Sequence, residues 1–220
     1  AFEAQRFAER HDVGQTYCSG ETVAPAERLP VQTIGFMGND KTPELMDLVP
    51  VLIQLLDRNP ELHFELFGSM AMPDALLHFG DRVTAIPRVS DYDDFVARFR
   101  ELKWEIGLAP LRQTPFNIVK ADTKWVDYTS MGTAVVASRN TAYDDCCADD
   151  CGLLADKAEE WAEAVQSLID DPNKRFTMAQ SAQAKLVRAY SLEQLADQVL
   201  KKFEKATAAA ADRRIALSAN

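Results

Sequence analysis

The hydrophobic positions of this chain follow two different periods that alternate along the sequence. Residues 31–37 form a short run rich in β-branched and aromatic side chains, which is typical of a buried strand. In residues 43–56, Leu45, Leu48 and Leu52 are three and four positions apart, which predicts an amphipathic helix. A strand followed by a helix of this length is the first part of a β-α-β unit with a right-handed crossover.

The alternation continues to residue 206. The expected strands are 31–37, 62–67, 82–86, 104–109, 133–137 and 152–155. The expected helices are 43–56, 92–102, 120–131, 158–169, 173–189 and 192–206. Strands that alternate with helices predict a mostly parallel sheet with helices on both faces. The expected fold class is therefore α/β, a Rossmann-like doubly wound parallel sheet with additional C-terminal helices.

Three regions are expected along the chain. Residues 1–30 end in Pro25 and Pro30, and we interpret them as a connector or the remnant of a preceding segment. Residues 31–206 form the Rossmann-like domain, and residues 207–220 form an alanine-rich tail. A single domain of this size is long enough to bury one well-filled core.

Composition and charge narrow the class of protein. Hydrophobic residues make up 47% of the chain, but no apolar run approaches the roughly 18 residues of a membrane-spanning helix. The basic and then apolar stretch of a secretory signal is not seen at the start, so we expect a cytoplasmic protein with no integral membrane segment. The net charge of −10 argues against nucleic acid as a partner, because binding to a phosphate backbone depends on clustered Lys and Arg.

Three of the four cysteines, Cys146, Cys147 and Cys151, fall in one acidic stretch. Their spacing is neither the paired arrangement of a zinc site nor the wide distribution of a disulfide framework. We expect reduced thiols in a loop and no metal site, with a metal or redox role as the alternative.

The three tryptophans, Trp104, Trp125 and Trp161, fall in expected strands and helices. These positions suit the large apolar surface of an indole ring. We therefore expect the tryptophans to pack in the core rather than to stack on a ligand.

The strongest candidate for chemistry is residues 110–128, which carry three basic residues and only two acids in a strongly acidic chain. Lys120 and Lys124 are four positions apart and would share one face of a helix, where like charges repel. An anionic ligand at the amino-terminal end of that helix would compensate, and a diphosphate suits such a position. The alternative is that Asp122 and Asp127 neutralise the lysines on a solvated face.

A second candidate is the turn after the first expected strand, which contains Gly35, Gly38 and Asn39. Glycine allows the backbone to approach a ligand closely, although many turns between strand and helix contain glycine for steric reasons alone. In a doubly wound sheet this turn and the Lys120 turn face the same crevice. The two segments are thus expected to form one site.

Residues 114–138 resemble the donor-binding motif of family 4-like glycosyltransferases, which have the two-domain GT-B fold. The matching features are Pro-Phe-Asn at 115–117, Lys120 and Lys124, Asp-Tyr at 127–128, and Gly132 before the strand at 134–138. Residues 34–38 also resemble the opening of that family's carboxyl-terminal domain, and 161–164 with Asp-Pro at 171–172 resemble its closing helices. The similarity spans roughly residues 31 to 205.

The resemblance implies a role for each of several residues. Asp127 stands where the family has a glutamate that binds the ribose hydroxyls. Lys120 and Lys124 would neutralise the diphosphate, backbone N–H groups near Asn39 would reach the phosphates or the sugar, and Arg88 lies where the family commonly holds the base. The implied nucleotide-sugar site comprises Gly38, Asn39, Arg88, Asn117, Lys120, Lys124, Asp127 and Tyr128. A nucleoside diphosphate sugar would be the donor substrate, with no further cofactor.

Two departures from the family limit what the resemblance implies. Val119 stands where many members have another glutamate, so the donor sugar and the stereochemical outcome stay open. The family's acceptor-binding domain has no counterpart in residues 1–30, so the partner is expected to be an acceptor-binding domain in the same or another chain. The chain alone is expected to lack turnover. The alternatives are a non-catalytic glycosyltransferase-like binding or scaffold module and another doubly wound protein.

Overall fold

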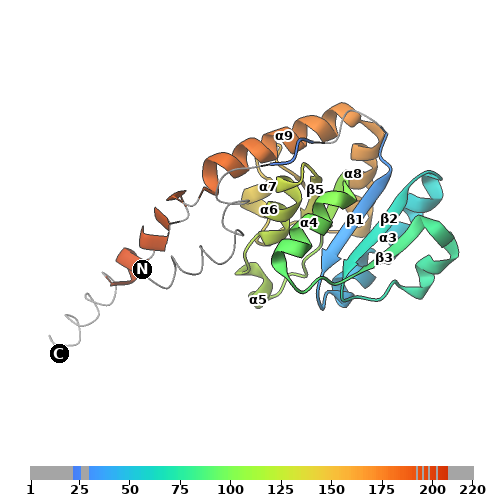
Figure 1. The fold of residues 1–220 in the computed structure, drawn as a ribbon, viewed down its shortest axis with the longest axis horizontal. Helices are drawn as coiled ribbons and strands as arrows, with labels where there is room; N and C mark the ends of the chain where they lie inside the picture. Colours follow the sequence, from blue (N-terminus) through green and yellow to red (C-terminus); the bar gives the residue numbers. More distant parts are fainter. Residues whose placement is uncertain are drawn as a thin grey trace.

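The computed structural model describes residues 22–25, 30–191, 193–194, 196–197, 199–201 and 203–207. Its centre is a six-stranded sheet in the order β3-β2-β1-β4-β5-β6, and every neighbouring pair is parallel. Figure 1 shows the strands side by side, with helices on both sides of the sheet. The strand order reverses between β1 and β4, which is the switch point where ligands bind in open α/β sheets. The Rossmann-like fold class predicted from the sequence is therefore confirmed.

The elements follow one another as strand and helix along almost the whole chain. The strands are β1 (Thr33–Gly38), β2 (His63–Gly68), β3 (Val83–Pro87), β4 (Ile106–Ala109), β5 (Ala134–Ser138) and β6 (Leu153–Ala155). The longer helices are α3 (Thr42–Arg58), α4 (Tyr92–Leu102), α6 (Thr123–Ser130), α8 (Ala158–Asp170) and α9 (Pro172–Ala189). Short helical segments are η1 (Asp74–Arg82), α5 (Pro115–Ile118) and α7 (Asp144–Cys147).

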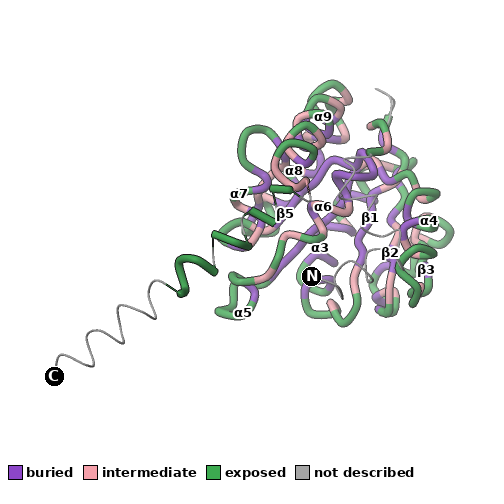
Figure 2. The backbone as a smooth tube through the Cα atoms, turned by 60° about the vertical axis from the view of Figure 1, so that its left-hand side comes forward, coloured by how far each residue is buried: buried purple, intermediate pink, exposed green. Residues whose placement is uncertain are grey.

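Two hydrophobic clusters hold the helices against the two faces of the sheet. One cluster joins α3 and α8 to inward side chains such as Phe36 and Val136, and the other joins α4, α6 and α9 to side chains such as Met37 and Val135. Successive residues of a strand point to opposite faces, so β1 and β5 contribute to both clusters. The buried parts of the tube in Figure 2 run through the sheet and the sheet-facing sides of the helices.

The structure also adds elements that the sequence pattern did not predict. The segments η1, α5 and α7 lie where loops were expected, and two cysteines that were expected in a loop, Cys146 and Cys147, are buried in α7. The helix expected over 120–131 begins only at Thr123. Lys120 and Lys124 therefore do not share a helix face, because Lys120 lies in the turn between α5 and α6.

The ends of the chain are described only in part. In the expected connector, Val23 donates its N–H to the carbonyl of Ser130 over 2.8 Å. The described residues between 193 and 207 are helical, whereas the remainder of the 1–30 connector, Cys18 and most of the 207–220 tail lie outside the described residues. No helix in the described ranges is both long and apolar enough to cross a membrane.

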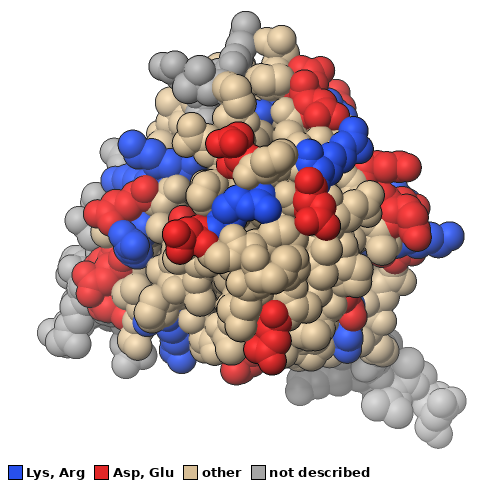
Figure 3. Space-filling model, turned by 90° about the vertical axis from the view of Figure 1, so that its right-hand side faces the viewer, with Lys and Arg blue, Asp and Glu red and all other residues tan. Residues whose placement is uncertain are grey.

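Acidic and basic side chains are mixed on the surface drawn in Figure 3. Among the described residues on that face, Lys and Arg form no continuous stripe of the kind that tracks a nucleic-acid backbone. A local excess of positive charge elsewhere is therefore informative in a chain with a net charge of −10.

Candidate functional site

A cavity of about 190 Å³ opens at the carboxyl ends of β1, β2 and β3. The register of these strands aligns Gly38 with Gly68 and Gly68 with Pro87, so the three strand ends lie level. Helices α4 and α6 supply the opposite wall. The lining residues are Met37, Gly38, Asn39, Phe67, Gly68, Arg88, Val89, Phe95, Thr123, Lys124 and Asp127. We call this the lysine cavity.

Two glycines keep the floor of the lysine cavity open. Gly68 has a φ of 144°, and a Cβ atom there would lie 1.9 Å from the carbonyl oxygen of Gly38. A Cβ atom on Gly38 would lie 2.9 Å from Cγ of Lys41 and 3.6 Å from Nζ of Lys124. Glycine at these two positions therefore lets the strand ends approach each other and lets both lysine side chains lie against the backbone.

Three lysines meet beside this floor. Lys41, which precedes α3, forms an ion pair with the buried carboxylate of Glu44 at 3.1 Å. Lys124 reaches back from the first turn of α6, and its Nζ lies 6.0 Å from the ring centre of Phe36. Lys120 lies near both of them, with its Nζ 4.7 Å from the ring centre of Phe116.

Burial and the close approach of the lysines lower the pKa of two of them. Burial first, and then repulsion from Lys41, lower the pKa of Lys124 to about 8, although the charge of Asp127 acts in the opposite direction. Loss of solvation also lowers the pKa of Lys120, and Lys41 contributes again. Positive charge is thus held close together at a cost, which a bound anion would relieve.

Part of the lysine cavity is apolar. The rings of Phe67 and Phe95 stack with their centres 5.3 Å apart and their planes at 22°. Val89 and the exposed residue Arg88 also line the cavity. The cavity therefore offers an aromatic and apolar surface together with the amine of Lys124.

The structure brings most of the predicted site residues together. Five of the eight line the lysine cavity, namely Gly38, Asn39, Arg88, Lys124 and Asp127. A sixth, Lys120, lies close enough to Lys124 for its charge to lower the pKa of Lys124, and the charge of Lys41 lowers the pKa of both. These contacts connect the two segments that were expected to face one crevice.

Asn117 and Tyr128 lie elsewhere, and both are buried. The side-chain amide of Asn117 donates to the carbonyl of Arg112 over 2.8 Å, which ties α5 to the loop after β4. The hydroxyl of Tyr128 accepts from the N–H of Met37 and donates to the carbonyl of Leu108, over 3.1 Å and 3.0 Å. Neither side chain lines the lysine cavity, and Tyr128 instead fixes the spacing between β1 and β4 at the switch point.

Some residues of the site were missed in the sequence. Lys41 follows the glycine turn directly and precedes the first helix, a position that could have identified it as an anion ligand. Phe67 is the penultimate residue of β2, and Phe95 lies in the first turn of α4. Both had the pattern of ordinary core residues, so their place in a cavity wall could not be read from the sequence.

Metal ligands are a separate question. Among the residues that the structure describes, no group of three or more His, Cys, Asp or Glu side chains is placed to hold a metal ion. The free thiols of Cys146, Cys147 and Cys151 are all buried.

Comparison with known proteins identifies the family. Residues 50–201 match the family described as glycosyl transferase-like. The chain belongs to this family. The resemblance to the donor-binding half of GT-B glycosyltransferases is thereby confirmed, and a search of curated proteins found no match.

Solved structures share the fold of this glycosyl transferase-like chain. The C-terminal domain of the group 1 glycosyl transferase LpcC from Francisella tularensis is 16% identical, with a TM-score of 0.59, and the match covers 81% of this chain and 93% of that domain. Anabaena HepE, solved with UDP and glucose, is 16% identical with a TM-score of 0.63, over 81% of this chain and 49% of HepE. S. aureus TarM, solved as a variant with UDP and other ligands, is 12% identical with a TM-score of 0.63, over 82% of this chain and 37% of TarM. The chain thus spans about half or less of the two longer proteins, and at this identity the likeness concerns the fold.

Proposed function

We propose that this chain is the donor-binding domain of a glycosyltransferase and holds a nucleoside diphosphate sugar in the lysine cavity. The observation that carries the proposal is the meeting of Lys41, Lys120 and Lys124 around one ion-paired carboxylate, Glu44. Three amines beside two carboxylates, those of Glu44 and Asp127, leave an excess of positive charge. A diphosphate placed there would gain charge-assisted hydrogen bonds and would restore the pKa of Lys124.

Other residues of the cavity suit the rest of a nucleotide. The Phe67 and Phe95 rings offer an apolar surface for a base, and Arg88 lines the same cavity. Asp127 also lines the cavity, and its carboxylate would accept hydrogen bonds from ribose hydroxyls. UDP is the first nucleotide to test, because HepE and TarM were both solved with UDP.

Sugar transfer would break the bond between the anomeric carbon and the diphosphate, and the electron pair would leave with the diphosphate. The acceptor oxygen would form the new bond and lose its proton. The lysines would stabilise the charge that develops on the departing diphosphate. We propose that the acceptor and the groups that activate it are supplied by a second domain, in the same or another chain, since this chain spans only 49% of HepE.

A second candidate function is donor binding without transfer, as in a scaffold module. The observation that favours it is Val119, whose side chain is 79% exposed and stands where the family has a glutamate. Both candidates predict binding of a nucleoside diphosphate. Only the first predicts sugar transfer when an acceptor-binding domain is supplied.

Calorimetric titration of the chain with UDP, GDP and ADP, and with their sugar conjugates, tests the binding step. We expect saturable binding of one nucleotide with and without magnesium. Lys120→Ala should weaken it by roughly 1.5–3 kcal/mol, the range for a lost hydrogen bond to a charged group.

The matched control for this titration is Lys205→Ala. This change removes the same charge from an exposed position in the C-terminal helical segment, and it should leave the dissociation constant unchanged. Absence of binding to every nucleotide, or an equal loss in both variants, would show that the lysine cavity is not the donor site.

A further inference from the structure

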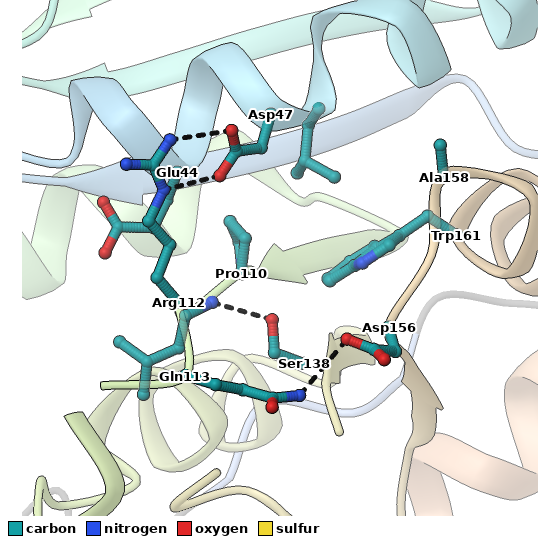
Figure 4. Close-up of a pocket in the computed structure, with 11 residues that line it drawn as sticks. Glu44, Asp47, Pro110, Arg112, Gln113, Ser138, Asp156, Ala158 and Trp161 are labelled. Carbon is teal, nitrogen blue, oxygen red and sulfur yellow. Dashed lines mark hydrogen bonds and ion pairs between the residues drawn. The ribbon is translucent and has the colours of Figure 1, made fainter. Parts of the chain in front are cut away.

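A second cavity, of about 270 Å³, lies at the same edge of the sheet but on the side of α3 and α8 (Figure 4). It is formed by the first turns of those helices, the loop after β4 and the ends of β5 and β6. The lining residues are Glu44, Asp47, Leu48, Pro110, Leu111, Arg112, Gln113, Ser138, Asp156, Ala158 and Trp161. We call this the carboxylate cavity.

The indole of Trp161 points into the carboxylate cavity in Figure 4 and has an unused hydrogen-bond donor. The residue is only 4% exposed, yet its N–H donates to no atom in the described part of the chain. The other two indoles are satisfied, since Trp104 donates to Glu65 over 2.6 Å and Trp125 donates to the carbonyl of Cys151 over 2.9 Å. Among the described residues, Oγ1 of Thr129 is the one buried side-chain polar atom without a partner, so the N–H of Trp161 is open to the cavity and available to a ligand.

Three further polar groups face the same space. The hydroxyl oxygen of Ser138 accepts from the N–H of Leu111 over 2.8 Å, which leaves its own hydrogen free to donate. The carboxylate of Asp156 accepts from the side-chain amide of Gln113 over 3.2 Å and forms no ion pair with a described basic residue. The cavity therefore presents donors and acceptors side by side.

The charges of this cavity do not suit an anion. Its guanidinium, on Arg112, is held by two hydrogen bonds of 2.7 Å and 2.8 Å to the carboxylate of Asp47. The carboxylate of Asp156 adds negative charge, whereas that of Glu44 is paired with Lys41. A neutral ligand with several hydroxyl groups matches these donors and acceptors, and a phosphate would be repelled.

We propose that the carboxylate cavity binds a single hexose ring, through the indole N–H of Trp161, the hydroxyl of Ser138 and the carboxylate of Asp156. The volume falls just below the usual range of small-molecule sites, roughly 300–1,000 Å³, and leaves room for one sugar ring. The ring is either a free monosaccharide or the terminal unit of a glycan. This site is separate from the lysine cavity, and the proposal does not depend on donor binding there.

Nuclear magnetic resonance of the three indole N–H groups tests the proposal. The chain is titrated with glucose, galactose, mannose and N-acetylglucosamine, and Trp161→Phe identifies the Trp161 signal by its disappearance. At least one of these sugars should shift the Trp161 signal in a saturable way, while the signals of Trp104 and Trp125 stay in place. Methyl glycosides then distinguish a free monosaccharide from the terminal unit of a glycan. Only a site for a glycan terminus accepts a substituent on the anomeric oxygen.

Substitutions of two other lining residues test the proposal without changing Trp161. Asp156→Ala and Ser138→Ala should each weaken binding of that sugar at least about tenfold. Asp57→Ala, which removes an exposed carboxylate from the last turn of α3, is the matched control for Asp156→Ala and should have no effect. The proposal is overturned if no sugar shifts the Trp161 signal, or if the shift is the same in Asp156→Ala and Ser138→Ala as in the unaltered chain.

Discussion

The lysine cavity and the carboxylate cavity lie at the same edge of one sheet and differ mainly in the charge of their walls. In the first, Lys41 lies close to Lys120 and Lys124, and its charge helps to lower the pKa of both. In the second, Arg112 is already neutralised by Asp47. Both cavities use the ends of parallel strands, so the fold provides the positions, and the side chains carried by the helices and loops decide which ligand each would accept.

The largest effect on the difference between the cavities is expected when two amines beside the lysine cavity are removed together. Lys120→Ala combined with Lys124→Met should weaken nucleotide binding by more than about 3 kcal/mol, since each change removes a charged donor. Sugar-induced shifts of the Trp161 signal should persist in the same protein. Urea unfolding checks the fold, and no loss of stability is expected, because Lys124→Met removes a charge that burial disfavours. A simultaneous loss of both binding activities would mean that the two cavities are not independent.

A second test asks whether Tyr128 stabilises the fold around the lysine cavity or contacts the nucleotide itself. Tyr128→Phe removes the hydroxyl that bridges Met37 and Leu108, leaving a buried N–H and a buried carbonyl without that partner. The free energy of unfolding, measured in urea, should fall by roughly 2–3 kcal/mol. Nucleotide affinity at a temperature where the chain is folded should change much less. A large loss of affinity with unchanged stability would instead place the Tyr128 hydroxyl on the nucleotide.

The third test uses pH. Lys124 has a pKa of about 8 in the free chain, and a bound diphosphate would raise it, so binding takes up a proton. Nucleotide affinity should therefore fall about tenfold between pH 7 and pH 9, and Lys124→Met should lose most of this dependence. The same depressed pKa makes the free chain gain stability as pH rises from about 8 toward the ordinary lysine value. Calorimetry at each pH measures the first effect, and a flat profile in the unaltered chain would contradict the assignment of Lys124.

The smallest effect is expected at the rim of the carboxylate cavity. Asp47→Ala breaks the pair with Arg112, whose partners are both about half exposed, so stability should change by less than about 1 kcal/mol. The freed guanidinium would make the cavity less negative. Nucleotide affinity at the lysine cavity, measured by calorimetry, should not change.

The fold was largely predictable because its signals are local. Residues 92–102 were predicted as a helix with the bounds that α4 has, and Asp91 caps it by accepting from two backbone N–H groups. The helix expected over 120–131 was too long, because periodicity continues through the turn that contains Lys120. The segments α5 and α7 have only four residues each, which is too few turns to produce a periodic pattern.

The site was less predictable because it depends on contacts between distant residues. Asn117 and Tyr128 belong to the donor-binding motif, yet both satisfy their hydrogen bonds inside the protein. Lys41 had a favourable position after the glycine turn, but its proximity to Lys124 depends on how the fold places β1 beside α6. The unused N–H of Trp161 is a property of packing, so the expectation of a core tryptophan was confirmed without revealing the donor.

The most direct test of the account is to locate bound nucleotide within the chain by nuclear magnetic resonance. UDP, with GDP and ADP beside it, is titrated into the isotope-labelled chain while the backbone N–H signals of Gly38 and Gly68 and the indole signal of Trp161 are followed. We predict that one nucleotide shifts the two glycine signals in a saturable way and leaves the Trp161 signal in place. Shifts confined to the Trp161 signal, or no saturable shift with any of the three nucleotides, would contradict the account.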